Sequence, residues 1–248
     1  MTLFTRLTTF VNTCMASHDP SHNPAHVHRV VSLARSILRA ERARHPTRLY
    51  DADVVDLAAL LHDVGDRKYL PQVMEIVASS SSSSSSSPST GGDSAGGNGD
   101  GIRPDELVLQ AMVSHGAEPE LARRVQTIVS HVSYSKEKKD PEAVRRLLDE
   151  EEGYAELAIV QDADRLDALG AVGIGRCFTF LGAQGRQFIP AGGEWEMGNA
   201  IEHFQEKLER LEGMMKTQSG REMARVRTQR LVEFRGWWED EMALASEI

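Results

Sequence analysis

The sequence has little cysteine, few aromatic residues and no surplus of positive charge. Its two cysteines, Cys14 and Cys177, lie far apart and form no CxxC pair, so neither a disulfide framework nor a zinc knuckle is indicated. The formal net charge of −9 argues against non-specific binding of nucleic acid, because no basic stripe is available to displace phosphate counterions. A small anionic ligand remains compatible with this charge where arginines and lysines gather locally.

Long apolar runs are also missing from the sequence. No segment approaches the roughly 18 continuous apolar residues of a membrane span, and the N-terminus lacks a charged-then-apolar signal peptide. We therefore expect a cytoplasmic protein that has no membrane partner.

The motifs of several common enzyme classes are absent as well. The sequence contains no GxxxxGK[ST] or GxGxxG pattern, which removes support for a P-loop or a dinucleotide site. His22 and His26 have the HxxxH spacing of a zinc protease, but no glutamate lies between them and Pro24 starts a helix after His22. The protease interpretation is rejected.

One low-complexity segment interrupts the chain. Residues 79 to 87 are all serine, and glycine-rich sequence continues to Gly101. Such a segment cannot bury enough apolar surface to offset the entropy lost on ordering. We predict that residues 79–101 are a disordered insertion within a single domain that spans residues 1–248, because the cost of loop closure grows slowly with loop length.

The rest of the chain shows helical apolar spacing, and no alternation is long enough to indicate a strand. We predict an all-α fold with helices at residues 24–44, 51–64, 71–78, 104–114, 119–130, 141–152, 154–180, 199–217 and 220–244. The last two form a C-terminal helical pair, residues 197–248, that is expected to pack on the domain. Its apolar residues favour core contacts or a homodimer interface over a lid.

A histidine and a histidine–aspartate pair are the first candidate ligands. His26 shares the apolar stripe of the 24–44 helix, so its imidazole is expected to point toward the core. His62 and Asp63 end the apolar run of the next helix. Burying both without a partner would cost several kcal/mol, and a divalent cation would compensate both. The alternatives are an ordinary core histidine and a capping pair.

Three aspartates, Asp162, Asp164 and Asp167, lie between apolar segments of the predicted 154–180 helix. At about 100° per residue, Asp164 groups with apolar positions, Asp167 borders the same face, and Asp162 lies about 160° away from Asp164. Helix geometry therefore favours Asp164 over Asp162 as a metal ligand. A solvated acidic face is the other interpretation of this cluster.

Taken in order, His26, the His62-Asp63 pair and a distant aspartate resemble the H…HD…D signature of the HD superfamily of metal-dependent phosphohydrolases. Residues 22–30, 59–64 and 160–171 resemble the small YpgQ/YedJ-type members of this superfamily, and the likeness extends from about Thr5 to Phe180. In such proteins the first motif commonly reads His-Asp-x-x-His. Here Asn23 takes the aspartate position, which removes a carboxylate that could support the ligands.

The resemblance implies a single HD-domain helical bundle. It also implies one divalent ion, Mn²⁺, Mg²⁺ or Fe²⁺, held by His26, His62, Asp63 and Asp164. The ligand types do not select among these metals, since mixed imidazole and carboxylate ligation suits several first-row ions.

Further residues are candidates through their position in the chain. Arg29 and Arg165 adjoin expected ligands and are candidate phosphate contacts, with surface ion pairs as the alternative. Asp66, four residues past His62, is a candidate general acid or water-orienting group beside the catalytic Asp63. His22 is expected to support the ligands from an outer position.

The resemblance adds a second group of candidates. Similar proteins carry a segment like residues 130–136 near the substrate, which makes His131 and Lys136 candidate phosphate contacts. Asp167, like His22, is a candidate supporting residue. His115 is either a further candidate or an ordinary loop histidine.

The function that follows is hydrolysis of nucleotides, with (deoxy)nucleoside triphosphates as the substrate class that the resemblance implies. A 5′-nucleotidase or phosphodiesterase is an alternative with the same chemistry. A non-catalytic HD module that binds a nucleotide is an alternative of another class. The presence of all four ligand types favours an enzyme.

Overall fold

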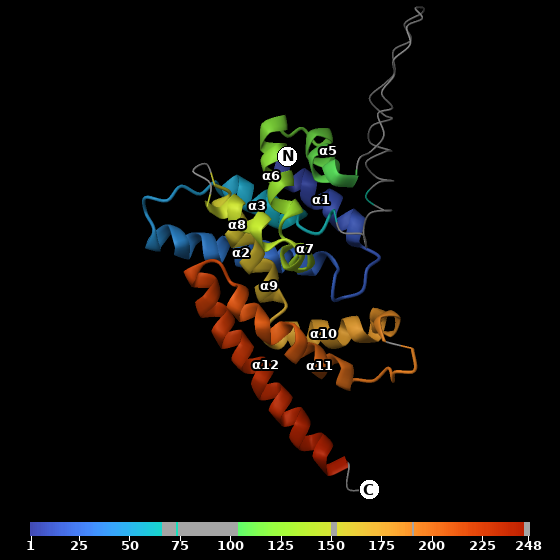
Figure 1. The fold of residues 1–248 in the computed structure, drawn as a ribbon. Helices are drawn as coiled ribbons and strands as arrows, with labels where there is room; N and C mark the ends of the chain where they lie inside the picture. The colour runs from blue at the N-terminus through green and yellow to red at the C-terminus, as the bar shows by residue number, and fades with distance from the viewer. Residues whose placement is uncertain (66–72, 74–103, 150–152, 190, 246–248) are drawn as a thin grey trace, which may run out of the picture.

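The computed structural model describes residues 1–65, 73, 104–149, 153–189 and 191–245, and within these residues it contains helices and no strand (Figure 1). The all-α expectation is confirmed. The predicted insertion at residues 79–101, the predicted helix at 71–78 apart from Val73, and Asp66 lie outside the described residues. In chain order the elements are α1 (Leu3–Met15), α2 (Pro24–Arg44), α3 (Ala52–Leu61), η1 (Pro104–Glu106), α5 (Leu107–Ser114), α6 (Pro119–Ser130), α7 (Tyr134–Lys139), α8 (Pro141–Asp149), α9 (Ala155–Asp167), α10 (Gly170–Gln184), η2 (Gly185–Phe188), α11 (Gly198–Glu206), η3 (Leu208–Met214) and α12 (Gln218–Ala245), where η denotes a 3₁₀ helix.

The helices that carry the first two motifs begin at strong caps. The side chain of Asn23 accepts a hydrogen bond from the N–H of Ala25 at 3.0 Å, and Pro24 supplies a preset φ at the first helical position of α2. The carboxylate of Asp51 accepts from two backbone N–H groups at the start of α3. These caps fix the start of each helix and therefore the face on which His26 lies.

The central helix of the fold is α9. Its apolar side chains at positions 157, 159, 160, 163 and 166 are fully buried, and α2, α3, α10 and α12 all pack against it. A helix that is buried on all sides belongs to the core, and each fully buried leucine, isoleucine or valine contributes about 1.5–3 kcal/mol. The aspartates of α9 are therefore held on a rigid element.

The predicted single helix over residues 154–180 is wrong. It breaks after α9, and the segment that follows is bent by 69°. Gly170 begins α10 with a φ of +70°, a conformation that side chains disfavour, so this glycine permits the turn. The predicted 199–217 helix also divides, into α11 and the 3₁₀ helix η3. Among the described residues, no single helix is long and apolar enough to cross a membrane.

The start of α12 is tied to α9 through Asp162. Its carboxylate accepts hydrogen bonds from the backbone N–H of Lys216 at 2.8 Å and from the N–H and hydroxyl of Thr217, both at 2.7 Å. A Cβ placed on Gly220 would lie 2.2 Å from this carboxylate, so only glycine permits the close approach. From this point α12 runs along α9 and α10, and its C-terminal end extends away from the other helices (Figure 1).

Candidate metal centre

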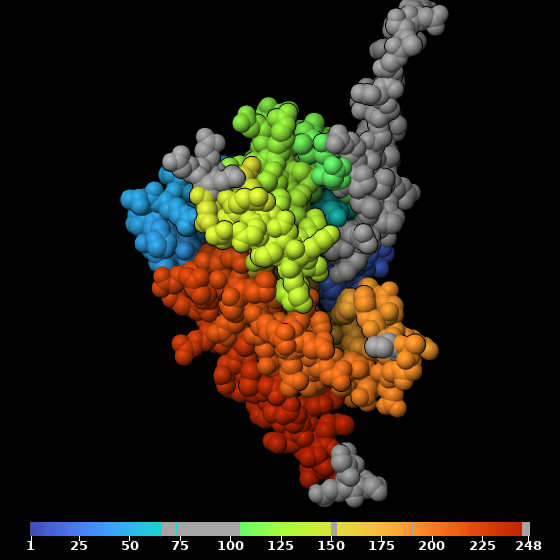
Figure 2. Space-filling view, viewed as in Figure 1, coloured from blue at the N-terminus to red at the C-terminus, as the bar shows by residue number. Residues whose placement is uncertain are grey.

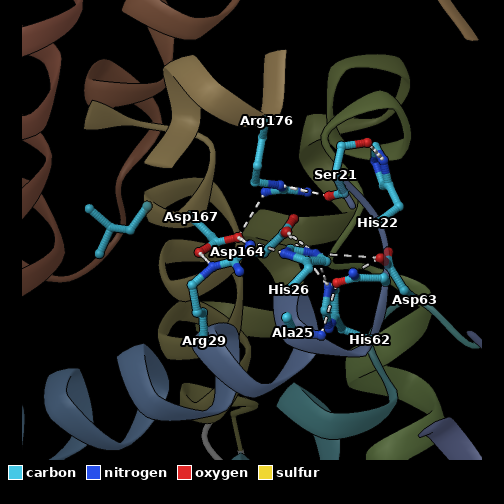
Figure 3. Close-up of polar contacts among 12 residues, drawn as sticks. Ser21, His22, Ala25, His26, Arg29, His62, Asp63, Asp164, Asp167 and Arg176 are labelled. Carbon is cyan, nitrogen blue, oxygen red and sulfur yellow. Dashed lines mark hydrogen bonds and ion pairs between the residues drawn. The ribbon is translucent and has the colours of Figure 1, made fainter. Parts of the chain in front are cut away.

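Two histidine nitrogens face each other in the core. The Nε2 atoms of His26, on α2, and His62, just after α3, lie 3.1 Å apart, and both side chains are about 1% exposed. Figure 3 shows the two imidazoles converging, with acidic side chains around them. The sequence placed these residues 36 positions apart, and the packing of α2 against α3 brings them together.

The other ring nitrogen of each histidine is already engaged. The Nδ1 of His26 lies 2.7 Å from the carboxylate of Asp167, and the Nδ1 of His62 lies 2.8 Å from the carbonyl oxygen of Ala59. Because a carbonyl oxygen only accepts, His62 must donate from Nδ1, and its neutral form then presents a lone pair at Nε2. If His26 has the same tautomer, the two Nε2 lone pairs face and repel each other. A cation bound between them would remove this repulsion.

Two carboxylates complete the cluster. An oxygen of Asp63 lies 3.5 Å from Nε2 of His26 and 3.6 Å from Nε2 of His62, and an oxygen of Asp164 lies 3.6 Å from each of the same nitrogens. Metal–ligand bonds of about 2.0–2.2 Å place two ligands at right angles about 3 Å apart, and wider angles give larger separations. The donor set therefore fits a divalent ion bound by two imidazoles and two carboxylates.

The electrostatics of the cluster also favour a cation. Without a metal, burial raises the pKa of Asp63, but the positive charge that His62 and His26 carry when protonated outweighs burial and holds this pKa well below its usual range. Burial lowers the pKa of His26, yet its hydrogen bonds to Asp167 and Asp63 give a net upward shift. The surroundings of His26 therefore favour a positive charge at the point where the anionic oxygens lie.

Asp167 supports the cluster from the end of α9. This buried carboxylate accepts the hydrogen bond from His26 and two more from Arg29, at 2.7 and 3.0 Å, and it lies 3.0 Å from Nη1 of Arg176. Figure 3 shows it between the two arginines. A carboxylate behind a ligating histidine fixes the tautomer and orientation of the ring. Asp167 is therefore in position to support His26, as its placement near the expected ligands suggested.

The first set of predicted supporting residues lies beside the cluster. The His22 ring is 6.2 Å from that of His26, and its Nδ1 is hydrogen-bonded to Ser21. Arg29 is directed to Asp167. The substrate-binding role of Arg29 and the supporting role of His22 remain proposals.

The structure contradicts the expected phosphate contact of Arg165. Its guanidinium is buried and is bound by Glu137 and by the carbonyl oxygen of Met214. The physical reason is the helical rotation of about 100° per residue, which turns Arg165 away from Asp164 although the two are adjacent in sequence. Asp162, the alternative ligand, is likewise directed to the start of α12.

The remaining candidates form local contacts. His131 donates from Nδ1 to the carbonyl oxygen of Thr127, and the exposed Lys136 donates to the carbonyl oxygen of Ser130. His115 donates to the carbonyl oxygen of Ala111. The roles of His131 and Lys136 toward a substrate remain predictions.

Arg176 is a residue of the site that was not predicted from the sequence. This arginine donates from Nε to the carbonyl oxygen of Ser21 at 2.8 Å and also faces Asp167, so it connects α10 to the segment before α2. It is the only charged residue between Asp167 and Arg186 in the sequence. A single charge in a long, otherwise uncharged segment is the sequence signal that could have identified it.

Comparison with known proteins gives relatives over nearly the whole chain. No protein-family model matches the sequence. YpgQ of Bacillus subtilis is 32% identical over 232 residues, which cover 92% of this chain and 88% of YpgQ. The crystal structure of YpgQ in complex with ADP is similar with a TM-score of 0.60 at 27% identity, covering 96% of this chain and 97% of that one.

Two further solved structures are similar to this chain. A Lactobacillus plantarum protein has a TM-score of 0.65 at 25% identity and covers 97% of both chains. An HD-superfamily hydrolase of Bacillus thuringiensis has a TM-score of 0.59 at 25% identity, with 97% of this chain and 96% of that one covered.

Proposed function

The chain belongs to the HD superfamily of hydrolases, and on that premise we propose that it is a metal-dependent phosphohydrolase that acts on nucleotides, with (deoxy)nucleoside triphosphates as the preferred class. The observation that carries the proposal is the pair of Nε2 atoms 3.1 Å apart, flanked by two carboxylates. The similar structure of YpgQ in complex with ADP supports a nucleotide as ligand.

His26, His62, Asp63 and Asp164 are the proposed ligands of one divalent ion, and one nitrogen or oxygen atom from each of His26, His62 and Asp164 lies within 4.8 Å of the others. A divalent ion held by these residues would supply a lowered pKa for a water molecule and polarisation of a phosphoryl oxygen. Mn²⁺, Mg²⁺ and Fe²⁺ all suit this donor set.

The protein contributes orientation and charge. Asp167 holds His26 through Nδ1, and the carbonyl oxygen of Ala59 holds His62, so both rings present Nε2 in a fixed direction. The side chains of Asp63 and Asp164 are 20% and 29% exposed, so the carboxylate side of the cluster is the side that solvent reaches. A phosphate group is proposed to approach from that side, with Asp66 as the proposed group that orients water or donates a proton.

The test combines metal analysis with product identification. Purified protein is assayed with Mn²⁺ against dNTPs, nucleoside monophosphates and a cyclic nucleotide. Release of pyrophosphate or phosphate from a dNTP supports the proposal. Release of a nucleoside from a monophosphate, or opening of the cyclic ester, would assign the alternative nucleotidase or phosphodiesterase activity. Nucleotide binding without any turnover would indicate the non-catalytic module.

A matched pair of variants tests the site itself. Asp164→Ala removes a proposed ligand and is expected to lower metal content and to reduce turnover by more than about 100-fold. Asp56→Ala is the control, since Asp56 is similarly exposed, at 23%, but is paired with Arg35 on the surface of α3. Undiminished metal content in the Asp164 variant would overturn the ligand assignment.

A further inference from the structure

A second candidate site lies outside the metal centre, between α7 and the α11–η3 segment. A cleft of about 470 Å³ is lined by Tyr134, Lys138, His203, Glu206, Lys207 and Arg210. Figure 2 shows the yellow-green surface that includes α7 meeting the orange surface of α11 on the viewed face. None of the lining residues belongs to the metal centre.

The cleft has a positive charge on a protein that is acidic overall. Three permanently cationic side chains, Lys138, Lys207 and Arg210, line it together with the single carboxylate of Glu206, whereas the whole chain has a net charge of −9. Within the described part of the chain, neither Lys138 nor Arg210 forms an ion pair. Gathering like charges in one concave region is unfavourable unless an anion compensates them.

The walls of the cleft hold these charges in place. The ammonium group of Lys207 lies 5.0 Å from the centre of the Tyr134 ring, a cation–π contact that joins the segment after α11 to α7. Burial lowers the pKa of the adjacent His203, and the charge of Lys207 lowers it further, as expected where the potential is positive.

A buried layer separates the cleft from the interior. Glu137, on the inner side of α7, accepts hydrogen bonds from Gln161 of α9, from Arg165 and from Lys216. This network fixes α7 against α9. Tyr134 and Lys138, on the same short helix, are left to face α11 across the cleft.

We propose that this cleft binds a small polyanion, a di- or triphosphate chain that is either free or part of a nucleotide, at a site separate from the metal centre. The volume lies within the roughly 300–1,000 Å³ range of small-molecule sites. Ammonium and guanidinium groups from two elements match several phosphate oxygens at once.

The test uses full-length Asp164→Ala protein in EDTA, so that the metal centre does not contribute and failure of the proposed function leaves the result unaffected. Calorimetric titration with pyrophosphate and with ATP is expected to show saturable binding at one site, while adenosine does not bind. Binding of ATP alone would assign the nucleotide as the source of the phosphate chain. Absence of binding by both phosphates at millimolar concentration, or equal binding of adenosine, overturns the proposal.

Paired charge variants locate the site. In the same background, Lys138→Gln with Arg210→Gln is expected to weaken binding about tenfold, because two charge-assisted contacts are lost. Lys139→Gln with Arg146→Gln removes the same charge from exposed positions outside the cleft and is expected to leave affinity within about twofold. Equal weakening by the two pairs would show a general charge effect and would overturn the assignment.

Discussion

Replacing Asp167 by asparagine tests the support of the metal centre while preserving the shape of the side chain. Its carboxylate accepts from His26 and Arg29 and faces Arg176, each at 2.7–3.0 Å. Burial raises the pKa of Asp167, but the hydrogen bonds from His26 and Arg29 and the charge of Arg176 outweigh it and hold the pKa well below its usual range. Asp167→Asn therefore removes a full charge and turns an amide donor toward groups that also donate.

The size of the effect follows from the partners that are left behind. The His26 ring loses the charged acceptor that fixes its tautomer, which lowers metal affinity by about 10–100-fold. Breaking a fully buried ion pair costs about 3–5 kcal/mol. The Arg29 side chain is 34% exposed and can turn to water, whereas that of Arg176 is only 14% exposed. We therefore expect a loss of about 2–4 kcal/mol in the free energy of unfolding.

Mn²⁺ titration by calorimetry and urea unfolding measure the two quantities separately. The matched control is Asp162→Asn on the same helix, which makes the same change at a buried aspartate that faces Lys216 and Thr217. It is expected to lower stability and to leave metal affinity within about threefold. Wild-type metal affinity in the Asp167 variant, or an equal loss in both variants, would refute the reasoning.

Two other predictions concern the junction between α9 and the C-terminal helices. Glu137→Gln is expected to destabilise the protein by about 3 kcal/mol at neutral pH, since it breaks a buried ion pair. Burial raises the pKa of Glu137, but the hydrogen bond from Lys216 and nearby guanidinium charge hold it below the usual 4.5. This stabilisation is complete above pH 4.5 and is lost as the pH falls through the folded-state pKa. The free energies of unfolding of wild-type and Glu137→Gln protein, measured by urea titration, should converge at acid pH. A difference that stays constant with pH would contradict the role assigned to Glu137. Gly220→Ala is expected to cost about 1–3 kcal/mol, because the new Cβ meets the Asp162 carboxylate. Gly213→Ala, where a Cβ meets open space, is the control in thermal unfolding, and equal melting temperatures would contradict the close approach.

The parts of the fold that local chemistry determines could be predicted. The 119–130 helix was predicted with the bounds that α6 shows, and α2 begins at the predicted cap because Asn23 and Pro24 act within one turn. The break between α9 and α10 depends on the φ of Gly170, and an apolar pattern that continues on both sides conceals it. Periodicity reports which residues face a core, and it does not report where the helix axis turns.

The candidate site was likewise predictable where sequence motifs are local, and not where it depends on the turn of a helix. The ordered H…HD…D pattern pointed to His26, His62, Asp63 and Asp164, and the structure brings these side chains together. Arg176 lies on α10, and the direction of α10 depends on the turn at Gly170, which was not predicted. The error on Arg165 came from treating a neighbour in sequence as a neighbour in space.

The two sides of α9 have a consequence for the folding cooperativity of the molecule. One side presents Asp164 and Asp167 to the metal centre, and the other holds Lys216 and Thr217, directly before α12, through Asp162. Any cation bound at the first side stabilises the folded conformation of α9 on which the Asp162 contacts depend, and linkage makes this effect reciprocal. Metal occupancy is therefore expected to slow amide hydrogen exchange at Lys216 and Thr217, which lie more than 40 residues beyond the last proposed ligand.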